Sequence, residues 1–187
     1  MSFKIFFKNN NSILVDEQHG FRPKRSCESQ LLTFTQYLFD KISHGGQVDA
    51  VVLNFSKAFD KVPHKRLMEK LNHYGIQGTT HSWVKAFLIN RTQQVVLDGA
   101  KSGIAHVLSG VPQGTVLGPT IFLIFINDLP CRVKSSVRLF ADDCVLFRLV
   151  RSECDHQILQ EDLEALNLWE NDWLMEFNAD KCFVLNI

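Results

Sequence analysis

The most constraining feature of the sequence is a pair of adjacent aspartates, Asp142 and Asp143, set between apolar runs at Val137–Phe140 and Cys144–Val150. Two apolar runs around so short a polar segment predict buried strands joined in a tight hairpin, with the acids at its tip. Carboxylates this close raise each other's pKa unless a cation lies between them, and Mg²⁺ is a hard ion that such oxygens bind. On its own, the pair fits a solvated turn better, because Asp is common in turns.

The rest of the chain mixes helical and extended patterns without a regular strand–helix–strand rhythm. Val48–Phe55 is a nearly continuous β-branched run, which predicts another buried strand. Asp98-Gly99 lies between two extended runs and predicts a second hairpin over Thr92–Leu108. These patterns indicate an α/β (α+β) fold with an antiparallel sheet covered by helices. Helices are predicted over residues 28–43, 63–75, 79–89, 115–128 and 153–175, and a last strand over Cys182–Ile187.

Apolar spacing predicts the buried faces of two of these helices. Ser26 can cap the first one, whose inward stripe is Leu31, Phe34, Leu38 and Ile42. In the helix over residues 153–175, the inward positions are Leu159, Leu163, Leu166 and Trp173.

The net charge of the chain is zero, but its charges are unevenly distributed. Residues 1–151 hold 19 Lys and Arg against 11 Asp and Glu, a net +8, whereas residues 152–187 hold one against nine. The first part could therefore bind a polyanion such as a nucleic acid. The simpler interpretation, which the charge pattern alone favours, is that the acids form one solvated helix face.

The five cysteines are widely spaced and include no Cys-x-x-Cys pair, which argues against a zinc site or a disulfide framework. Their use fits a reducing, intracellular compartment, cytoplasmic or nuclear. Met1–Asn10 has no signal-peptide pattern, and the longest apolar run, Ile121–Ile126, is too short to span a bilayer. We therefore expect no membrane association, and the sequence does not indicate an oligomeric state.

Three further stretches contain residue types that bind nucleotides or phosphates. Gly110–Gly114 encloses Gln113 between two glycines, which allows the backbone to approach a ligand closely. A plain strand-to-helix connection explains these glycines equally well. Gly20–Ser26 carries Arg22, Lys24 and Arg25 before a predicted helix N-terminus, a plausible phosphate site or an ordinary basic loop. The third stretch, Leu53–His64, directly follows the predicted buried strand.

Together these stretches resemble the reverse transcriptases of non-LTR retrotransposons, with the jockey-like group most similar. QHGFRPKRSCESQLL resembles a fingers motif, and LNFSKAFDKVPH resembles a palm motif that usually reads LDFSKAFDKVPH. SGVPQGTVLGPTIFLIFINDLP, LFADD and WLMEFNADKC resemble the three palm segments that follow. The resemblance runs from about Gln18 to Cys182, and five motifs in the same order make it specific.

The resemblance implies a right-hand polymerase fold that copies RNA into DNA from deoxynucleoside triphosphates, with two Mg²⁺ (or Mn²⁺) ions. An RNA template and a DNA primer are then the expected partners. Residues 1–187 would form a single truncated domain, with partial fingers over about 1–47 and the palm over about 48–187. The palm would carry a fingers-side hairpin near 92–109. No segment resembles a thumb or an endonuclease, so we expect both to be absent.

By motif position, the resemblance also assigns roles to individual residues. Asp142 and Asp143 resemble the paired catalytic carboxylates that bind metal, and Lys181 resembles a lysine that protonates the leaving pyrophosphate. Phe59 resembles the side chain that excludes a ribose 2′ hydroxyl. The nucleotide pocket would include Gln113 and Gly114, and the triphosphate contacts would be Arg22, Lys24 and Arg25. The positive charge of residues 1–151, and not the motif match, makes Lys65 and Arg66 further candidates for phosphate contact.

The sequence departs from the family pattern at Asn54, where the first catalytic aspartate is expected. Asn keeps an oxygen that can ligate a metal but lacks the negative charge. Asp60 cannot readily replace it, because six residues span about 9 Å along a helix and about 20 Å along a strand. We therefore expect an RNA-directed DNA polymerase domain that is impaired or inactive. The alternatives are a non-catalytic nucleic-acid-binding remnant, a pseudogene product, or a sequence error at this codon.

Overall fold

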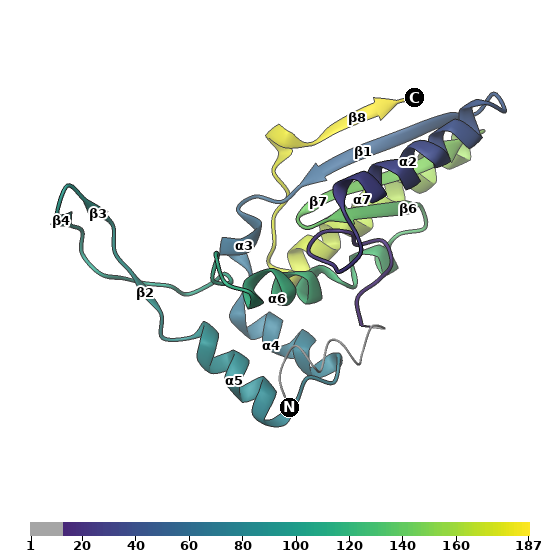
Figure 1. The fold of residues 1–187 in the computed structure, drawn as a ribbon. Helices are drawn as coiled ribbons and strands as arrows, with labels where there is room; N and C mark the ends of the chain where they lie inside the picture. Colours follow the sequence, from purple (N-terminus) through teal and green to yellow (C-terminus); the bar gives the residue numbers. More distant parts are fainter. Residues whose placement is uncertain (1–12) are drawn as a thin grey trace. The chain divides into compact units, whose positions relative to one another are not determined.

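Four strands of the chain form one antiparallel sheet in the order β6-β7-β1-β8 (Figure 1). The computed structural model describes residues 13–187, so the expectation for Met1–Asn10 lies outside the described residues. The predicted runs form β1 (Gln47–Asn54), β6 (Ser136–Phe140), β7 (Asp143–Val150) and β8 (Phe183–Asn186). All four predicted strands therefore form, and each observed end lies within one residue of the predicted one.

The chain divides into two compact units. One unit comprises Leu14–Ala58 and Ile126–Ile187 and contains the whole sheet. The other contains Phe59–Phe125, with most of the remaining helices and the second hairpin.

In the first unit, two helices cover opposite faces of the sheet. Phe34 and Tyr37 of α2 (Cys27–Ile42) meet the Phe147 ring edge-on, with ring centroids 5.0 and 4.9 Å away. Asp155 of α7 (Glu153–Trp173) accepts a hydrogen bond from Arg148 at 2.9 Å. Because consecutive strand residues point to opposite faces, contacts at Phe147 and Arg148 put α2 and α7 on different sides.

The structure confirms part of each predicted helix face and corrects the rest. Ser26 and Ser29 form a capping box at the start of α2, as the Ser26 cap predicts. The expectation that Leu31 and Ile42 face inward is wrong, because α2 packs on the sheet through its middle turns and leaves these side chains 55% and 41% exposed.

In α7, Leu159 and Leu166 are buried as predicted. The buried tryptophan is Trp169, whereas Trp173 is only partly buried. The Trp169 indole donates a hydrogen bond to Asp128 at 3.1 Å, which explains how its polar edge is satisfied inside the unit.

The second unit contains two packed helices, α4 (His64–His73) and α5 (Gly78–Leu88), joined by a turn at Gly75. Their buried side chains include Leu67, Leu71, Val84 and Leu88. The short α3 (Ala58–Lys61) begins at the boundary of the unit, and the apolar α6 (Leu117–Ile126) ends at it. Every residue from Ile121 to Ile126 is buried, and α6 lies within the helix predicted over residues 115–128.

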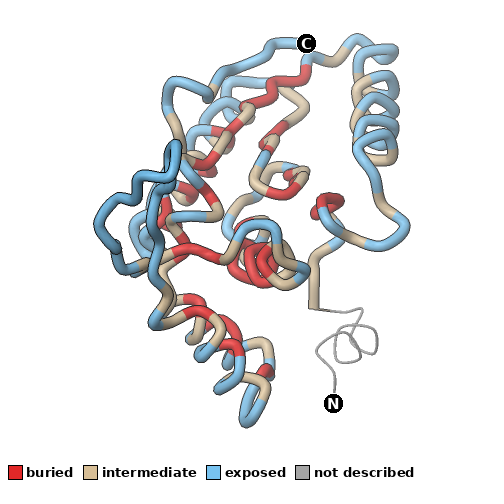
Figure 2. Tube along the Cα trace, turned by 60° about the vertical axis from the view of Figure 1, so that its left-hand side comes forward, coloured by how far each residue is buried: buried red, intermediate tan, exposed pale blue. Residues whose placement is uncertain are grey.

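The second hairpin also forms where the sequence predicts it. It consists of β2 (Thr92–Gln93) paired with β5 (Ala105–His106), and β3 (Val96–Leu97) paired with β4 (Ala100–Lys101). Asp98 and Gly99 both have positive φ, as a two-residue turn of type I′ requires. The hairpin is exposed along nearly its whole length (Figure 2).

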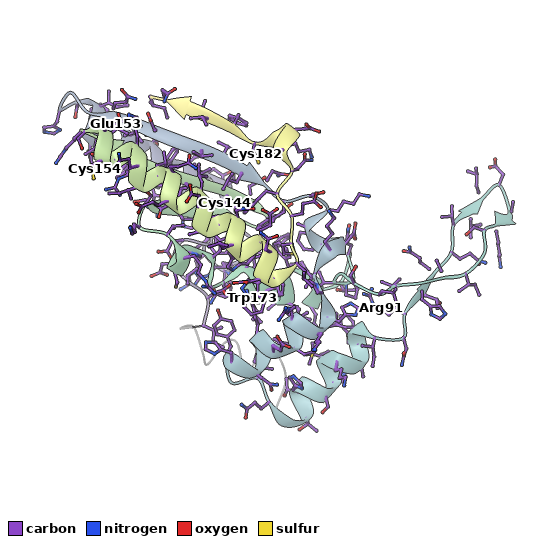
Figure 3. All side chains as sticks on the ribbon, turned by 180° about the vertical axis from the view of Figure 1, so that it is seen from behind. Arg91, Cys144, Glu153, Cys154, Trp173 and Cys182 are labelled. Carbon is purple, nitrogen blue, oxygen red and sulfur yellow. The ribbon has the colours of Figure 1, made fainter. Side chains whose placement is uncertain are left out.

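Two short 3₁₀ helices, η1 (Leu129–Arg132) and η2 (Ala179–Lys181), complete the described elements. No helix within residues 13–187 is both long and apolar enough to cross a bilayer. All five cysteines are thiols; Figure 3 labels Cys144, Cys182 and Cys154, the last near the start of α7. Burial, with smaller contributions from Cys182 and Asp143, raises the pKa of the Cys144 thiol to about 12, so this thiol stays protonated.

Candidate functional site

The adjacent aspartates lie at the turn between β6 and β7. β6 ends at Phe140 and β7 begins at Asp143, so Ala141 and Asp142 alone form the connection. Asp143 pairs across the sheet with Asn54, the last residue of β1. The Asn54 side-chain amide donates a hydrogen bond to an Asp143 carboxylate oxygen at 2.8 Å. The structure thus places Asn54 directly beside one of the paired acids.

A second backbone connection brings Lys181 to the same end of the sheet. Phe55 stacks on Phe177 with ring centroids 4.4 Å apart. The Asn178 N–H then donates to the Asn54 carbonyl at 2.7 Å, immediately before η2. Because η2 includes Lys181, this segment places the lysine where its charge acts on Asp142. Asn54, Asp142, Asp143 and Lys181 therefore belong to one cluster within one unit.

The carboxyl group of Asp142 is half-buried, and its pKa is raised. Burial is the largest cause, and the neighbouring Asp143 charge raises the pKa further, while a hydrogen bond to the residue's own backbone and the Lys181 charge lower it. The charged form of Asp142 is thus disfavoured where no cation compensates it.

The donor set fits a divalent cation only in part. Two aspartate carboxylates and an amide oxygen are the hard oxygen ligands that Mg²⁺ and Mn²⁺ accept. Among residues 13–187, however, no three His, Cys, Asp or Glu side chains are grouped so that they could hold a metal. Asn54 supplies the third side chain at this site and contributes no charge.

The raised pKa of Asp142 predicts a pH dependence of stability. A carboxyl whose folded pKa is raised contributes stability that is full below its unfolded pKa and is lost as the pH rises through the folded pKa. Without metal, Asp142→Asn should therefore raise the free energy of unfolding at pH 7 and change it little at pH 3. Urea unfolding at both pH values measures this, with the exposed Asp172→Asn as the control. A gain at pH 7 no larger than that of the control would contradict the prediction.

The second unit brings together Phe59 and the Gly110–Gly114 loop. The Val111 N–H donates to the Phe59 carbonyl at 2.7 Å, and the Gln113 side chain donates to Asp60 at 2.9 Å. The Phe59 ring stacks on Phe122 with centroids 4.5 Å apart, so its orientation is fixed by packing. Gln113 and Gly114 are exposed, and Gly114 has a φ of +72° that suits glycine.

The three basic residues before α2 differ in their surroundings. Arg22 donates to the Val15 carbonyl at 2.6 Å, and burial, with a smaller effect of Arg25, lowers its pKa, although it remains charged. Arg25 forms an ion pair with Asp16 at 2.6 Å. Lys24 is exposed and has no hydrogen bond or ion pair within the described part of the chain. Sequence reasoning missed Asp16, whose charge already offsets one of these cations.

Sequence reasoning also gave no role to Gln18, a buried residue that contacts the turn between β6 and β7. Its side chain forms hydrogen bonds with the backbone of Ala141, the residue before Asp142. The available signal was a polar residue at the start of the QHGFRP motif, but its contact is 123 residues away in the sequence.

Comparisons with known proteins agree with this arrangement. A protein-family model described as reverse transcriptase (RNA-dependent DNA polymerase) matches residues 4–186. The chain is 31% identical to the RNA-directed DNA polymerase from mobile element jockey of Drosophila melanogaster, over 88% of this chain and 19% of that protein. It is also 31% identical to the probable RNA-directed DNA polymerase from transposon BS of the same species, over 92% of this chain and 20% of the relative. The chain spans about a fifth of the length of these curated relatives.

Solved structures show the same fold at low sequence identity. The apo telomerase from Candida tropicalis superimposes with a TM-score of 0.70 at 12% identity, over 98% of this chain and 39% of that chain. Telomerase from Candida albicans, solved with a telomeric RNA fragment, gives 0.69 at 12% identity, over 95% of this chain and 33% of that one. These likenesses confirm the expected right-hand polymerase fold.

Proposed function

The chain belongs to the reverse transcriptase (RNA-dependent DNA polymerase) family, and we propose that it is a palm with part of the fingers whose polymerase chemistry is impaired at Asn54. The observation that carries this proposal is the Asn54 amide, 2.8 Å from the Asp143 carboxylate. A neutral side chain there occupies the place of a third carboxylate. The partial fingers would extend over about 1–47, and the palm over about 48–187 with a fingers-side hairpin near 92–109.

The proposed reaction adds a deoxynucleotide to a DNA primer paired with an RNA template. The primer 3′ hydroxyl loses its proton to solvent as its oxygen bonds to the α-phosphorus. The bond from that phosphorus to the bridging oxygen breaks, and pyrophosphate leaves. Divalent cations would supply charge neutralisation for the attacking and leaving oxygens. Asp142 and Asp143 would hold these ions, and Asn54 would offer only one neutral oxygen. Lys181 would donate a proton to the leaving pyrophosphate.

We assign the nucleotide contacts by motif position, separately within each unit. Phe59, fixed by its packing on Phe122, would exclude a ribose 2′ hydroxyl, and Gln113 and Gly114 would line the nucleotide pocket. Lys24 is the best-placed triphosphate contact of the three basic residues, because Arg22 and Arg25 already bind neighbouring groups. Because the proposed substrates of the protein are nucleic acids, we expect the protein in the cytoplasm or nucleus.

A second candidate function is nucleic-acid binding without catalysis. The net +8 charge of residues 1–151 favours it, since phosphate contacts by Lys and Arg need no metal site. Binding to a primer–template that weakens steeply with salt would separate this function from a folded chain with no role.

The metal site provides the test of the proposal. We expect weak Mn²⁺ binding in isothermal titration, and loss of this binding in Asp142→Ala/Asp143→Ala, because these carboxylates carry the charge of the site. The matched control is Asp40→Ala/Asp172→Ala, which removes two exposed acids of the same unit. If both double variants bind Mn²⁺ as the natural chain does, the site assignment is wrong.

A further inference from the structure

A short segment before α2 runs beside the strand that leads to the aspartates. The Leu139 N–H donates to the Glu17 carbonyl at 2.9 Å, and the His19 N–H donates to the Leu139 carbonyl at 2.8 Å. Gln18 and Leu139 thereby form a parallel bridge alongside β6. This pairing brings the Gln18 side chain to the turn that carries Asp142.

The Gln18 side-chain amide uses both of its ends at this turn. Its nitrogen donates to the Ala141 carbonyl at 3.1 Å, and its oxygen accepts from the Ala141 N–H at 2.9 Å. The same oxygen accepts from the Gly20 N–H at 2.7 Å. Gln18 is 2% exposed, so water cannot replace these hydrogen bonds.

The backbone that Gln18 contacts is one that needs support. Ala141 has a φ of +54°, a left-handed conformation that is unfavourable for a residue with a Cβ. Gly20 packs so closely that an added Cβ would overlap the Ala141 nitrogen and lie 3.0 Å from the Phe140 carbonyl carbon. The segment therefore holds Ala141 through two hydrogen bonds and through close backbone contact.

We propose that Gln18 is a positioning residue that fixes the Ala141 turn and so sets the placement of the Asp142 and Asp143 carboxylates. The proposal deepens the proposed function and rests on it, because the placement matters only if these carboxylates hold a cation. A ligand pair must be held within a fraction of an ångström to bind a small divalent ion well. Gln18 contacts neither metal nor substrate; it acts through the backbone of the turn.

The first variant to test is Gln18→Met, which keeps the length of the side chain and removes its hydrogen bonds. The matched control is Asn127→Leu. Asn127 is also buried, and it accepts a hydrogen bond from the Val15 N–H at 2.9 Å, on the same segment but away from the turn. Both changes remove a buried polar contact of this segment, and only Gln18→Met removes contacts with Ala141.

Two measurements distinguish positioning from a structural role. We expect Gln18→Met to speed hydrogen exchange of the Ala141 N–H about tenfold relative to N–H groups in the middle of β7. In the Asn54→Asp background, it should weaken Mn²⁺ binding about fivefold to tenfold. Asn127→Leu should lower global stability without either local effect.

Ala141→Gly provides a rescue, since glycine adopts positive φ without support. Added to Gln18→Met, it should restore most of the Mn²⁺ affinity, or restore folding if Gln18→Met alone does not fold. Any of three results would overturn the proposal. They are unchanged hydrogen exchange of the Ala141 N–H in Gln18→Met, equal effects of Gln18→Met and Asn127→Leu on this exchange and on Mn²⁺ binding, or failure of Ala141→Gly to rescue. If Ala141 exchange rises as expected but the Asn54→Asp chain binds no Mn²⁺, the positioning is supported and the proposed function is contradicted.

Discussion

Gly110→Ala is expected to lower the free energy of unfolding by about 3 kcal/mol or more. Gly110 has a φ of +82°, and an added Cβ would lie 2.6 Å from the Asp60 carbonyl oxygen and 2.8 Å from that of Phe59. These neighbours are backbone atoms, which cannot rotate away as a side chain can. The substitution therefore combines an unfavourable dihedral angle with an overlap.

The same glycine is held on several sides, so the loop cannot shift easily. Its N–H donates to the Val62 carbonyl at 2.8 Å, and its own carbonyl oxygen is 2.8 Å from both a His64 ring nitrogen and an Arg91 guanidinium nitrogen. These contacts fix the start of the loop that carries Gln113. Gly110→Ala should thus displace the loop that carries Gln113 as well as lower the stability.

The matched control is Gly114→Ala at the other end of the loop. Gly114 also has positive φ, +72°, but nothing lies within 4 Å of the position that a Cβ would take. It should cost about 1 kcal/mol, because only the dihedral penalty applies. Urea unfolding of the three chains measures both values. Equal losses for the two variants would show that the overlap at Gly110 is relieved and would contradict the argument.

The sequence predicted the strands and the aspartate turn because their signals are local. A mostly apolar run defines β1 or β7 without knowledge of its partners, and Asp142 and Asp143 mark the turn between two such runs. The pairing of Asn54 with Asp143 is a matter of register between strands 89 residues apart. Only the resemblance to a known family suggested that these two residues act together.

The contacts that sequence reasoning missed depend on distant packing. Gln18 reaches Ala141 because its segment pairs with β6, and nothing in the local pattern indicates that partner. The charge of Arg25 is offset by Asp16 through a loop conformation that composition does not report. Helical spacing identified the apolar stripe of α2, but the part that the sheet covers depends on where Phe147 lies.

Asn54→Asp is expected to raise the rate of nucleotide incorporation about a thousandfold, or about 4 kcal/mol of transition-state stabilisation. In the natural chain, the Asn54 amide donates to Asp143 and occupies an oxygen that a cation would need. An aspartate there would face Asp143 with like charge, which is stable only with a cation between them. The substitution therefore replaces the hydrogen bond from a neutral amide with a third carboxylate, which can bind a cation together with Asp142 and Asp143.

Asn178→Asp provides the matched control for this change. It adds the same charge at the residue whose own N–H donates to the Asn54 carbonyl at 2.7 Å. Its side chain accepts a hydrogen bond from the Asp180 N–H at 3.2 Å, and within residues 13–187 it forms no hydrogen bond with Asp143. If only Asn54→Asp raises the rate of nucleotide incorporation, the increase depends on the position of the new carboxylate and not on the added charge alone.

The most direct test of the impaired site is single-nucleotide incorporation on a primed RNA template, with Mg²⁺ and with Mn²⁺, by the natural chain and both Asn→Asp variants. We expect no detectable incorporation by the natural chain or by Asn178→Asp, and measurable incorporation by Asn54→Asp. Robust incorporation by the natural chain, or equal rates for the natural chain and Asn54→Asp, would contradict the account.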